Sequence, residues 1–231
     1  MSGIQTLVAA ATPARPPHRP NRLLRAGLVA GPLFVAVFLV EQAFRAGYDP
    51  MRHPVSSLEL GAGGWVQVVN FLVAGVLCLA FAAGLRRALR PGPGCAAAPL
   101  LLGIWGAGLL GAGAFVTDPV SGYPKGTPAV ADPPTWHGQL HDLAFSLPGF
   151  VSFAAAMFVL AYAYARRRAP WSAVLSGASG VAFVALFVLT NLGFSQHPHL
   201  VGVAGLLQRL TVGVGWLWLA LVAAREIRAD R

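Results

Sequence analysis

The chain has 231 residues, of which 56% are hydrophobic and only 11% charged, and 17 Lys and Arg against 8 Asp and Glu leave a net charge of +9. The apolar residues gather into runs long enough to cross the roughly 30 Å hydrocarbon layer as helices, which excludes a soluble globular protein. The positive charge is spread over tails and tight turns with no folded basic face between them. We therefore expect contact with the lipid bilayer and its anionic headgroups, and no nucleic-acid partner.

The first 22 residues are rich in Pro, Ala and Arg and lack an apolar period. Their positive charge follows the weak apolar stretch instead of preceding it, unlike a signal peptide. We predict a disordered cytoplasmic tail at 1–22 and a six-helix membrane domain at 23–231. The use of 16 Arg to a single Lys, with abundant Ala, Gly and Pro, is typical of a bacterium with a GC-rich genome.

Six runs are long and apolar enough to span a bilayer, and each is expected to be helical because a helix satisfies its own backbone hydrogen bonds in lipid. The fold class is thus an all-α integral membrane protein, a bundle of six transmembrane helices. The predicted spans are 27–44, 65–85, 96–116, 141–165, 171–194 and 200–224. Trp65, Trp136 and Trp171 stand at span ends and are interpreted as anchors at the membrane interface.

The basic residues set the orientation of these spans, because short cytoplasmic loops carry an excess of Lys and Arg. Thirteen of the 17 flank one side, and only Arg45, Arg52, Lys125 and Arg209 fall on or toward the other, which also holds six of the eight acids. Both termini are therefore predicted to be cytoplasmic, in a multi-pass protein of the plasma membrane.

Two long segments, 45–64 and 117–140, are predicted on the outer side. Within the first, Ser56-Ser57-Leu58-Glu59 fits a capping box at the start of a short surface helix. Within the second, Asp132-Pro133-Pro134 predicts that the fourth helix begins near Pro133, with a later kink at Pro148. Loops of this length are often functional, although simple solvated connectors of this length are common too.

Five of the six histidines fall on the predicted outer side. His137 and His141 are four residues apart, which places both imidazoles on one helix face, and His197 and His199 flank a proline that holds the segment extended. Together they suggest a zinc site of three nitrogens plus a carboxylate or water, with zinc as the cofactor. The alternative is that these rings lie at the headgroup layer because one side of each is apolar.

Arg209, next to Gln208, lies well inside the sixth span, where an unpaired guanidinium is costly. We expect it to face the bundle interior and pair with Glu41 or Asp142. Such a pair would either fix helix packing or form part of an anion site. Asn70 and Asn191 are expected in the same hydrogen-bond network. Ser56 and Ser57 beside His53 suggest a nucleophile with its base, but the capping box already explains Ser56 and no oxyanion motif accompanies them.

Several of these residues also form a familiar pattern. Five short segments follow one another along the chain: Tyr48-Asp49-Pro50, then His53-Pro54-Val55-Ser56-Ser57-Leu58 to Gly61, the Arg86-Arg87 end of a span, Asp118-Pro119, and 137–142. This pattern resembles the bacterial membrane family called domain of unknown function 998, over nearly the whole chain after the tail. The resemblance implies a six-helix membrane domain and leaves the activity unassigned.

The leading functional hypothesis is an outward-facing polar pocket, roofed by the two outer loops, that binds a ligand, a lipid headgroup or a metal. One alternative is a metal-dependent hydrolase acting on a lipid, with Asp142 as the catalytic general base or as a group that orients the ligands. Another is a small transporter or sensor in which Arg209 binds an anion. The predicted ligand-binding residues are Arg209, Gln208, Glu41, Asp118, Asp49 and Ser57, and the predicted metal ligands are His137, His141, His197 and His199.

Overall fold

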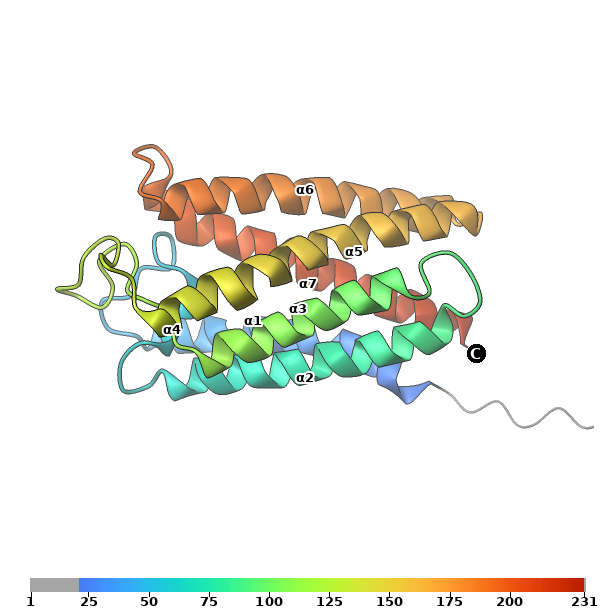
Figure 1. Cartoon of the computed structure of the whole chain (residues 1–231), viewed down its shortest axis with the longest axis horizontal. Helices are drawn as coiled ribbons and strands as arrows, with labels where there is room; N and C mark the ends of the chain where they lie inside the picture. Colours follow the sequence, from blue (N-terminus) through green and yellow to red (C-terminus); the bar gives the residue numbers. More distant parts are fainter. Residues whose placement is uncertain (1–20, 231) are drawn as a thin grey trace, which may run out of the picture.

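The computed structural model describes residues 21–230, and the predicted tail lies outside this part up to residue 20. The prediction of six membrane-spanning helices is confirmed within these residues (Figure 1). The spans are α1 (Arg25–Ala43) with the short η1 (Arg22–Leu24) before it, α2 (Trp65–Ala88), α3 (Ala97–Ala114), a fourth composite helix (Trp136–Arg166), α6 (Pro170–Phe194) and α7 (Ala204–Ala229) preceded by η4 (Val201–Val203).

The six spans form a closed ring. Each packs on its neighbours in chain order, and α7 returns to pack on α1. Buried aromatic side chains fill the middle of the ring, where Trp105 of α3 and Phe153 of the fourth span stack with their centroids 4.7 Å apart. Apolar side chains point outward as well, with Val181 and Leu217 each 63% exposed. Apolar residues on both the inner and outer faces are expected of a bundle surrounded by lipid.

Glycines allow α2 and α3 to approach closely. A Cβ on Gly75 would lie 2.8 Å from the carbonyl oxygen of Gly106, and one on Gly106 would lie 3.0 Å from that of Gly75. Small residues at such contacts increase van der Waals packing between membrane helices, where lipid supplies no hydrophobic driving force.

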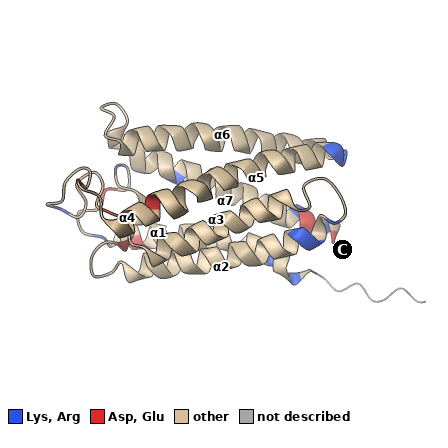
Figure 2. Cartoon of the chain, viewed as in Figure 1, with Lys and Arg blue, Asp and Glu red and all other residues tan. Residues whose placement is uncertain are grey.

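The two ends of the bundle differ in loop length and charge (Figure 2). At the basic end, short turns follow Arg86 and Arg87 in α2 and Arg166 in the fourth span. The described chain also begins and ends there, since the backbone N–H of Asn21 donates to Asp230 at 2.7 Å. The other end, here called the loop end, carries the long segments 44–64 and 115–135. Cytoplasmic placement of the basic end stays a prediction.

The fourth span contains three pieces, α4 (Trp136–Gln139), the π-helical η3 (Leu140–Ser146) and α5 (Leu147–Arg166). Pro148 lies in the first turn of α5, and because it has no N–H to donate, it interrupts the α-helical hydrogen bonding just after η3. The prediction that Asp132 caps this helix near Pro133 is wrong. Thr135 is the cap, its hydroxyl accepts from the N–H of Gly138 at 3.1 Å, and the Asp118 carboxylate holds it in place.

The first loop also differs from its prediction. Residues Val55–Glu59 form a 3₁₀ turn, η2, that follows Pro54 and has no side-chain cap, so the predicted capping box is absent. Glu59 turns into the protein instead, where its carboxylate accepts the backbone N–H of Thr117 at 3.2 Å. This contact ties the first loop to the start of the second.

Candidate functional site

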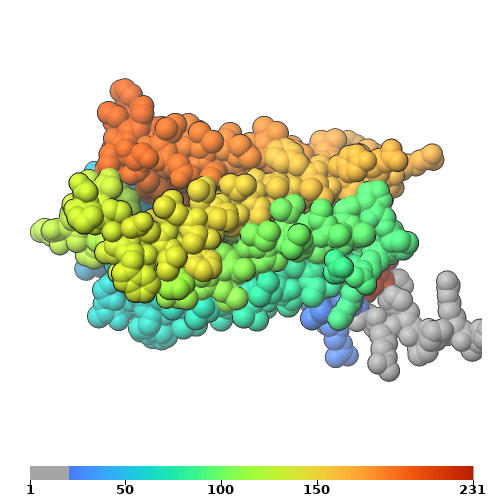
Figure 3. All heavy atoms as spheres, in the orientation of Figure 1, coloured from blue at the N-terminus to red at the C-terminus, as the bar shows by residue number. Residues whose placement is uncertain are grey.

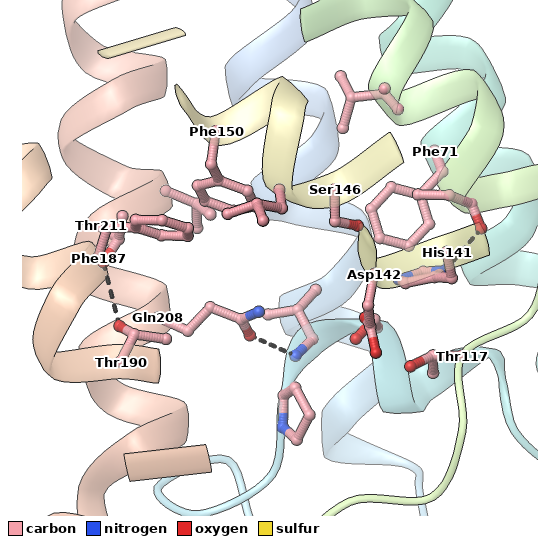
Figure 4. A pocket seen from close by; sticks show the side chains of 18 of the residues that line it. Phe71, Thr117, His141, Asp142, Ser146, Phe150, Phe187, Thr190, Gln208 and Thr211 are labelled. Carbon is pink, nitrogen blue, oxygen red and sulfur yellow. Dashed lines mark hydrogen bonds between the residues drawn. The ribbon is translucent and has the colours of Figure 1, made fainter. Parts of the chain in front are cut away.

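A cavity of about 290 Å³ lies inside the ring toward the loop end. Helices α3, α6 and α7 and the fourth span form most of its walls, α1 and α2 contribute one residue each, and residues of both long loops cover it. Figure 4 shows the side chains of α6 and α7 on one side of the space and those of η3 on the other. The apolar lining includes Phe34, Phe71, Trp105, Leu109, Leu147, Phe150, Phe187 and Trp216, and the polar lining includes Ser56, Thr117, His141, Asp142, Ser146, Thr190, Asn191, Gln208 and Thr211.

Exposed residues among this lining place an opening between the fourth span and α6. Leu143 and Leu147 are 62% and 43% exposed, and Asn191 of α6, which lines the same cavity, is also exposed. Nearer the basic end, Phe150 and Phe187 stack with their centroids 4.8 Å apart and join the two helices. In the space-filling view, the fourth span forms the face between α3 and α6 (Figure 3). The exposed lining residues of the fourth span therefore lie on the side of the bundle, between the basic end and the loop end.

Asp142 and Ser146 of η3 line one wall of the cavity (Figure 4). Asp142 is exposed, and it has no hydrogen-bond or ion-pair partner among residues 21–230. It is also the one lining residue of the described chain that is an Asp, Glu, Lys or Arg. A carboxylate with no partner in a largely apolar space favours a ligand that is a cation or a hydrogen-bond donor.

His141, the neighbour of Asp142, is buried and fixed by the backbone. Its Nδ1 lies 2.7 Å from the carbonyl oxygen of Phe115 and 3.0 Å from that of Ala112, and 3.6 Å from Oε2 of Glu59. A nitrogen surrounded by three oxygens must carry a proton. The neutral imidazole therefore keeps its lone pair on Nε2, which remains available as an acceptor.

Glu59 lies behind this wall with a fully buried side chain. The pKa of its carboxyl is raised to about 8, mainly by burial; the N–H of Thr117 lowers this pKa, and the charges of Asp142 and Glu41 raise it. Its Oε1 has no partner within the described chain. Near neutral pH a protonated Glu59 adds no second negative charge behind Asp142.

The opposite wall offers neutral polar groups. Oε1 of Gln208 accepts the backbone N–H of Val55 at 2.7 Å, which leaves its amide nitrogen to donate (Figure 4). Thr190 of α6 and Thr211 of α7 share a hydrogen bond of 3.3 Å. Gln208, predicted to bind a ligand, thus lies in the cavity lining, whereas sequence reasoning missed Ser146, Thr190 and Thr211. Hydroxyls are common in membrane helices, so only their position in the ring distinguishes these three.

Arg209 faces the bundle interior but does not line the cavity. It donates to Oε1 of Gln42 from Nε and Nη2 at 3.1 and 2.9 Å, to the hydroxyl of Tyr48 at 2.7 Å, and to the carbonyl oxygens of His53 and Gly205 at 3.1 and 2.9 Å. All five N–H groups are therefore used. The prediction of a carboxylate partner is wrong for the described residues, because Glu41 pairs instead with Arg45 at 2.6 Å.

Asp118, Asp49 and Ser57, also predicted to bind a ligand, have places outside the cavity lining. Asp118 accepts the N–H and hydroxyl of Thr135 at 2.9 and 2.7 Å, and it packs so closely that a Cβ on Gly138 would lie 2.2 Å from its carboxylate. Asp49 accepts the N–H of Met51 at 2.9 Å in an exposed turn. Ser57 is a fully buried residue of η2, and its neighbour Ser56 lines the cavity.

The four predicted metal ligands are not brought together. His137 donates to or accepts from local groups, with Nδ1 2.8 Å from the carbonyl oxygen of Val116, and His141 is held as described above. His197 and His199 lie beside each other beyond α6, their ring centroids 5.8 Å apart. Among residues 21–230, no three His, Cys, Asp or Glu side chains group as a metal site requires. The zinc hypothesis stays a prediction without geometric support.

Comparison with known proteins identifies a family for this chain. The model of a family described as "Protein of unknown function (DUF998)" matches residues 28–225, which is most of the chain and nearly all of the ring. No curated protein and no solved structure matches significantly.

Proposed function

The chain belongs to the DUF998 family, and we propose that this multi-pass membrane protein binds one amphiphilic molecule taken sideways from the bilayer into the cavity between α3, the fourth span, α6 and α7. The observation that carries the proposal is the cavity itself. Its lining is aromatic and aliphatic over most of its surface and polar along η3 and along the part of α7 on the opposite wall. A ligand with an apolar body and a polar head matches such a lining better than a wholly polar solute does.

The position of the opening supports a ligand that comes from the membrane. Leu143 and Leu147 stand at the opening, exposed on the side of the bundle. A lipid chain that passes between them leaves one apolar environment for another, so entry needs no dehydration of the chain. About 290 Å³ is at the small end of the range of ligand cavities, so we expect the head and the first part of one chain to lie inside.

The transporter hypothesis has less support. Toward the basic end, the described interior of the ring is filled by buried side chains, among them Phe81, Phe153, Met157, Leu160 and Trp218. A transport path to that end would require these residues to repack. The hydrolase hypothesis rested on converging histidines, and those of the described chain do not converge.

Two tryptophans in the cavity wall, Trp105 and Trp216, provide a direct test. Bromine on a lipid chain quenches tryptophan fluorescence only at short range. Replacing the exposed Trp65, Trp136 and Trp171 by Phe leaves Trp105, Trp216 and the buried Trp218 as reporters. In phosphatidylcholine nanodiscs, a brominated alkyl amphiphile is expected to quench these reporters saturably.

Matched variants of η3 separate entry from general contact with lipid. Ser146→Phe fills the cavity beside the opening, whereas Ala144→Phe adds the same ring at an exposed position outside the lining. We expect Ser146→Phe to abolish quenching and Ala144→Phe to preserve it. Asn191→Phe should also abolish quenching, because it blocks entry of the amphiphile from the α6 side. Equal quenching in all three variants, or no quenching with an amine, hydroxyl or carboxylate head, would overturn the proposal.

A further inference from the structure

We propose that the amphiphile carries an ammonium head, as in a long-chain amine or amino alcohol, and that the carboxylate of Asp142 binds it. This inference rests on the proposed function and specifies the class of its ligand. It goes beyond that function because an apolar cavity with a polar wall would by itself also accept an alcohol, a fatty acid or a phospholipid head.

The charge of the lining selects among these heads. Asp142 is the one Asp, Glu, Lys or Arg of the described chain in the cavity wall, and no side chain of residues 21–230 neutralises it by an ion pair. Two like charges a few ångströms apart in a medium of low dielectric repel strongly, so a carboxylate or phosphate head is disfavoured beside Asp142. An ammonium head is attracted by the negative charge of the same carboxylate.

One candidate for a compensating cation, Arg209, already has all of its N–H groups in hydrogen bonds. Arg209 adjoins the lining residue Gln208, but each of its five N–H groups has an acceptor in Gln42, Tyr48 or the backbone. Drawing Arg209 toward an anionic head would break these hydrogen bonds, at roughly 1–3 kcal/mol for each buried acceptor left without a donor. The cavity therefore lacks the Arg or Lys that phosphate and carboxylate sites use.

The wall around Asp142 offers acceptors that suit an ammonium. An ammonium has three N–H donors. Figure 4 shows Ser146 and His141 along the same wall as Asp142. The Ser146 hydroxyl has no partner among the described residues, and the lone pair of His141 remains on Nε2 because its Nδ1 proton is held by the carbonyls of Ala112 and Phe115. Across the space, the free amide N–H of Gln208 can donate to a hydroxyl or carbonyl next to the amine.

The test uses the fluorescence reporters described above with three probes that share one brominated chain and differ in their heads, an amine, a hydroxyl and a carboxylate. Nanodiscs of zwitterionic phosphatidylcholine keep the membrane surface from concentrating the charged probes. We expect saturation at the lowest concentration for the amine, then the alcohol, then the carboxylate. Asp142→Asn should weaken amine binding about tenfold to hundredfold and leave alcohol binding nearly unchanged.

Asp132→Asn is the matched control, since it removes the same charge from an exposed position of the second loop at the same end. It should leave all three affinities unchanged. Equal binding of the three heads, tighter binding of the carboxylate, or amine binding that survives Asp142→Asn would overturn the ammonium proposal while the cavity still binds amphiphiles. Failure of every head to quench would instead overturn the proposed function.

Discussion

Asp142 and Arg209 are two charged groups at the same end of the ring, and their surroundings are opposite. Arg209 has an acceptor for every N–H, supplied by α1, the first loop and its own helix. Asp142 faces a cavity and has no such partner in the described chain. A charge whose hydrogen bonds are complete serves the packing of the fold, whereas a charge left without a partner beside an accessible space is available to a ligand.

The largest effect is expected from breaking the Arg209 network. Arg209→Leu removes the five hydrogen bonds to Gln42, Tyr48, His53 and Gly205, and we expect a loss of roughly 3–5 kcal/mol in the free energy of unfolding. Thermal unfolding in detergent measures it. The exposed Arg228, changed to Leu, serves as the control and should shift stability by less than about 0.5 kcal/mol. Equal effects of the two changes would contradict a structural role for Arg209.

Glu59 adds a third case to this comparison, because within the described chain its buried carboxyl group has neither an arginine partner nor a place in the cavity lining. Its pKa is raised by burial from 4.5 to about 8 in the folded protein, so the folded state binds the proton more tightly than the unfolded state. Glu59 therefore contributes stability that is complete below pH 4.5 and is lost as the pH rises through about 8.

We expect the unfolding temperature in detergent to fall across this pH range and Glu59→Gln to flatten the profile, because the amide keeps the shape and cannot ionise. The exposed Asp132→Asn should leave the slope as it is. A Glu59→Gln profile that still falls as steeply as the parent would assign the dependence to another group.

The smallest effect on stability is expected at Asp142. Because the carboxylate has no partner to lose, Asp142→Asn should change the free energy of unfolding by less than about 0.5 kcal/mol or increase it. The same detergent assay used for Arg209→Leu gives the value. A loss comparable to that of Arg209→Leu would mean that Asp142 holds the fold together, and the contrast between the two charges would disappear.

The sequence alone determined the class of this protein and the number of its membrane-spanning helices. Runs of apolar residues of bilayer length predicted six helices, and the structure has spans near each predicted range, because spanning lipid requires both apolar side chains and satisfied backbone groups. The family resemblance carried by Tyr48 to Gly61 and Asp118-Pro119 was confirmed. Asp142, His141 and Gln208 were also among the predicted site residues that line the cavity.

Tertiary structure decided which polar groups meet. Arg209 was expected to need a carboxylate partner, because its depth in the membrane can be read from the sequence. In the structure, Gln42, Tyr48 and two backbone carbonyls are its acceptors. The packing of the first loop brings these groups together, and residue spacing does not reveal that packing. The histidines were expected to converge because they share a side, yet sharing a side fixes depth and not position around the ring. The cavity itself depends on the closure of α7 onto α1 and on the π-helical turn before Pro148, which sets the direction of Asp142 and Ser146. Periodicity along one helix fixes its apolar faces, whereas the space between helices depends on how all six pack together.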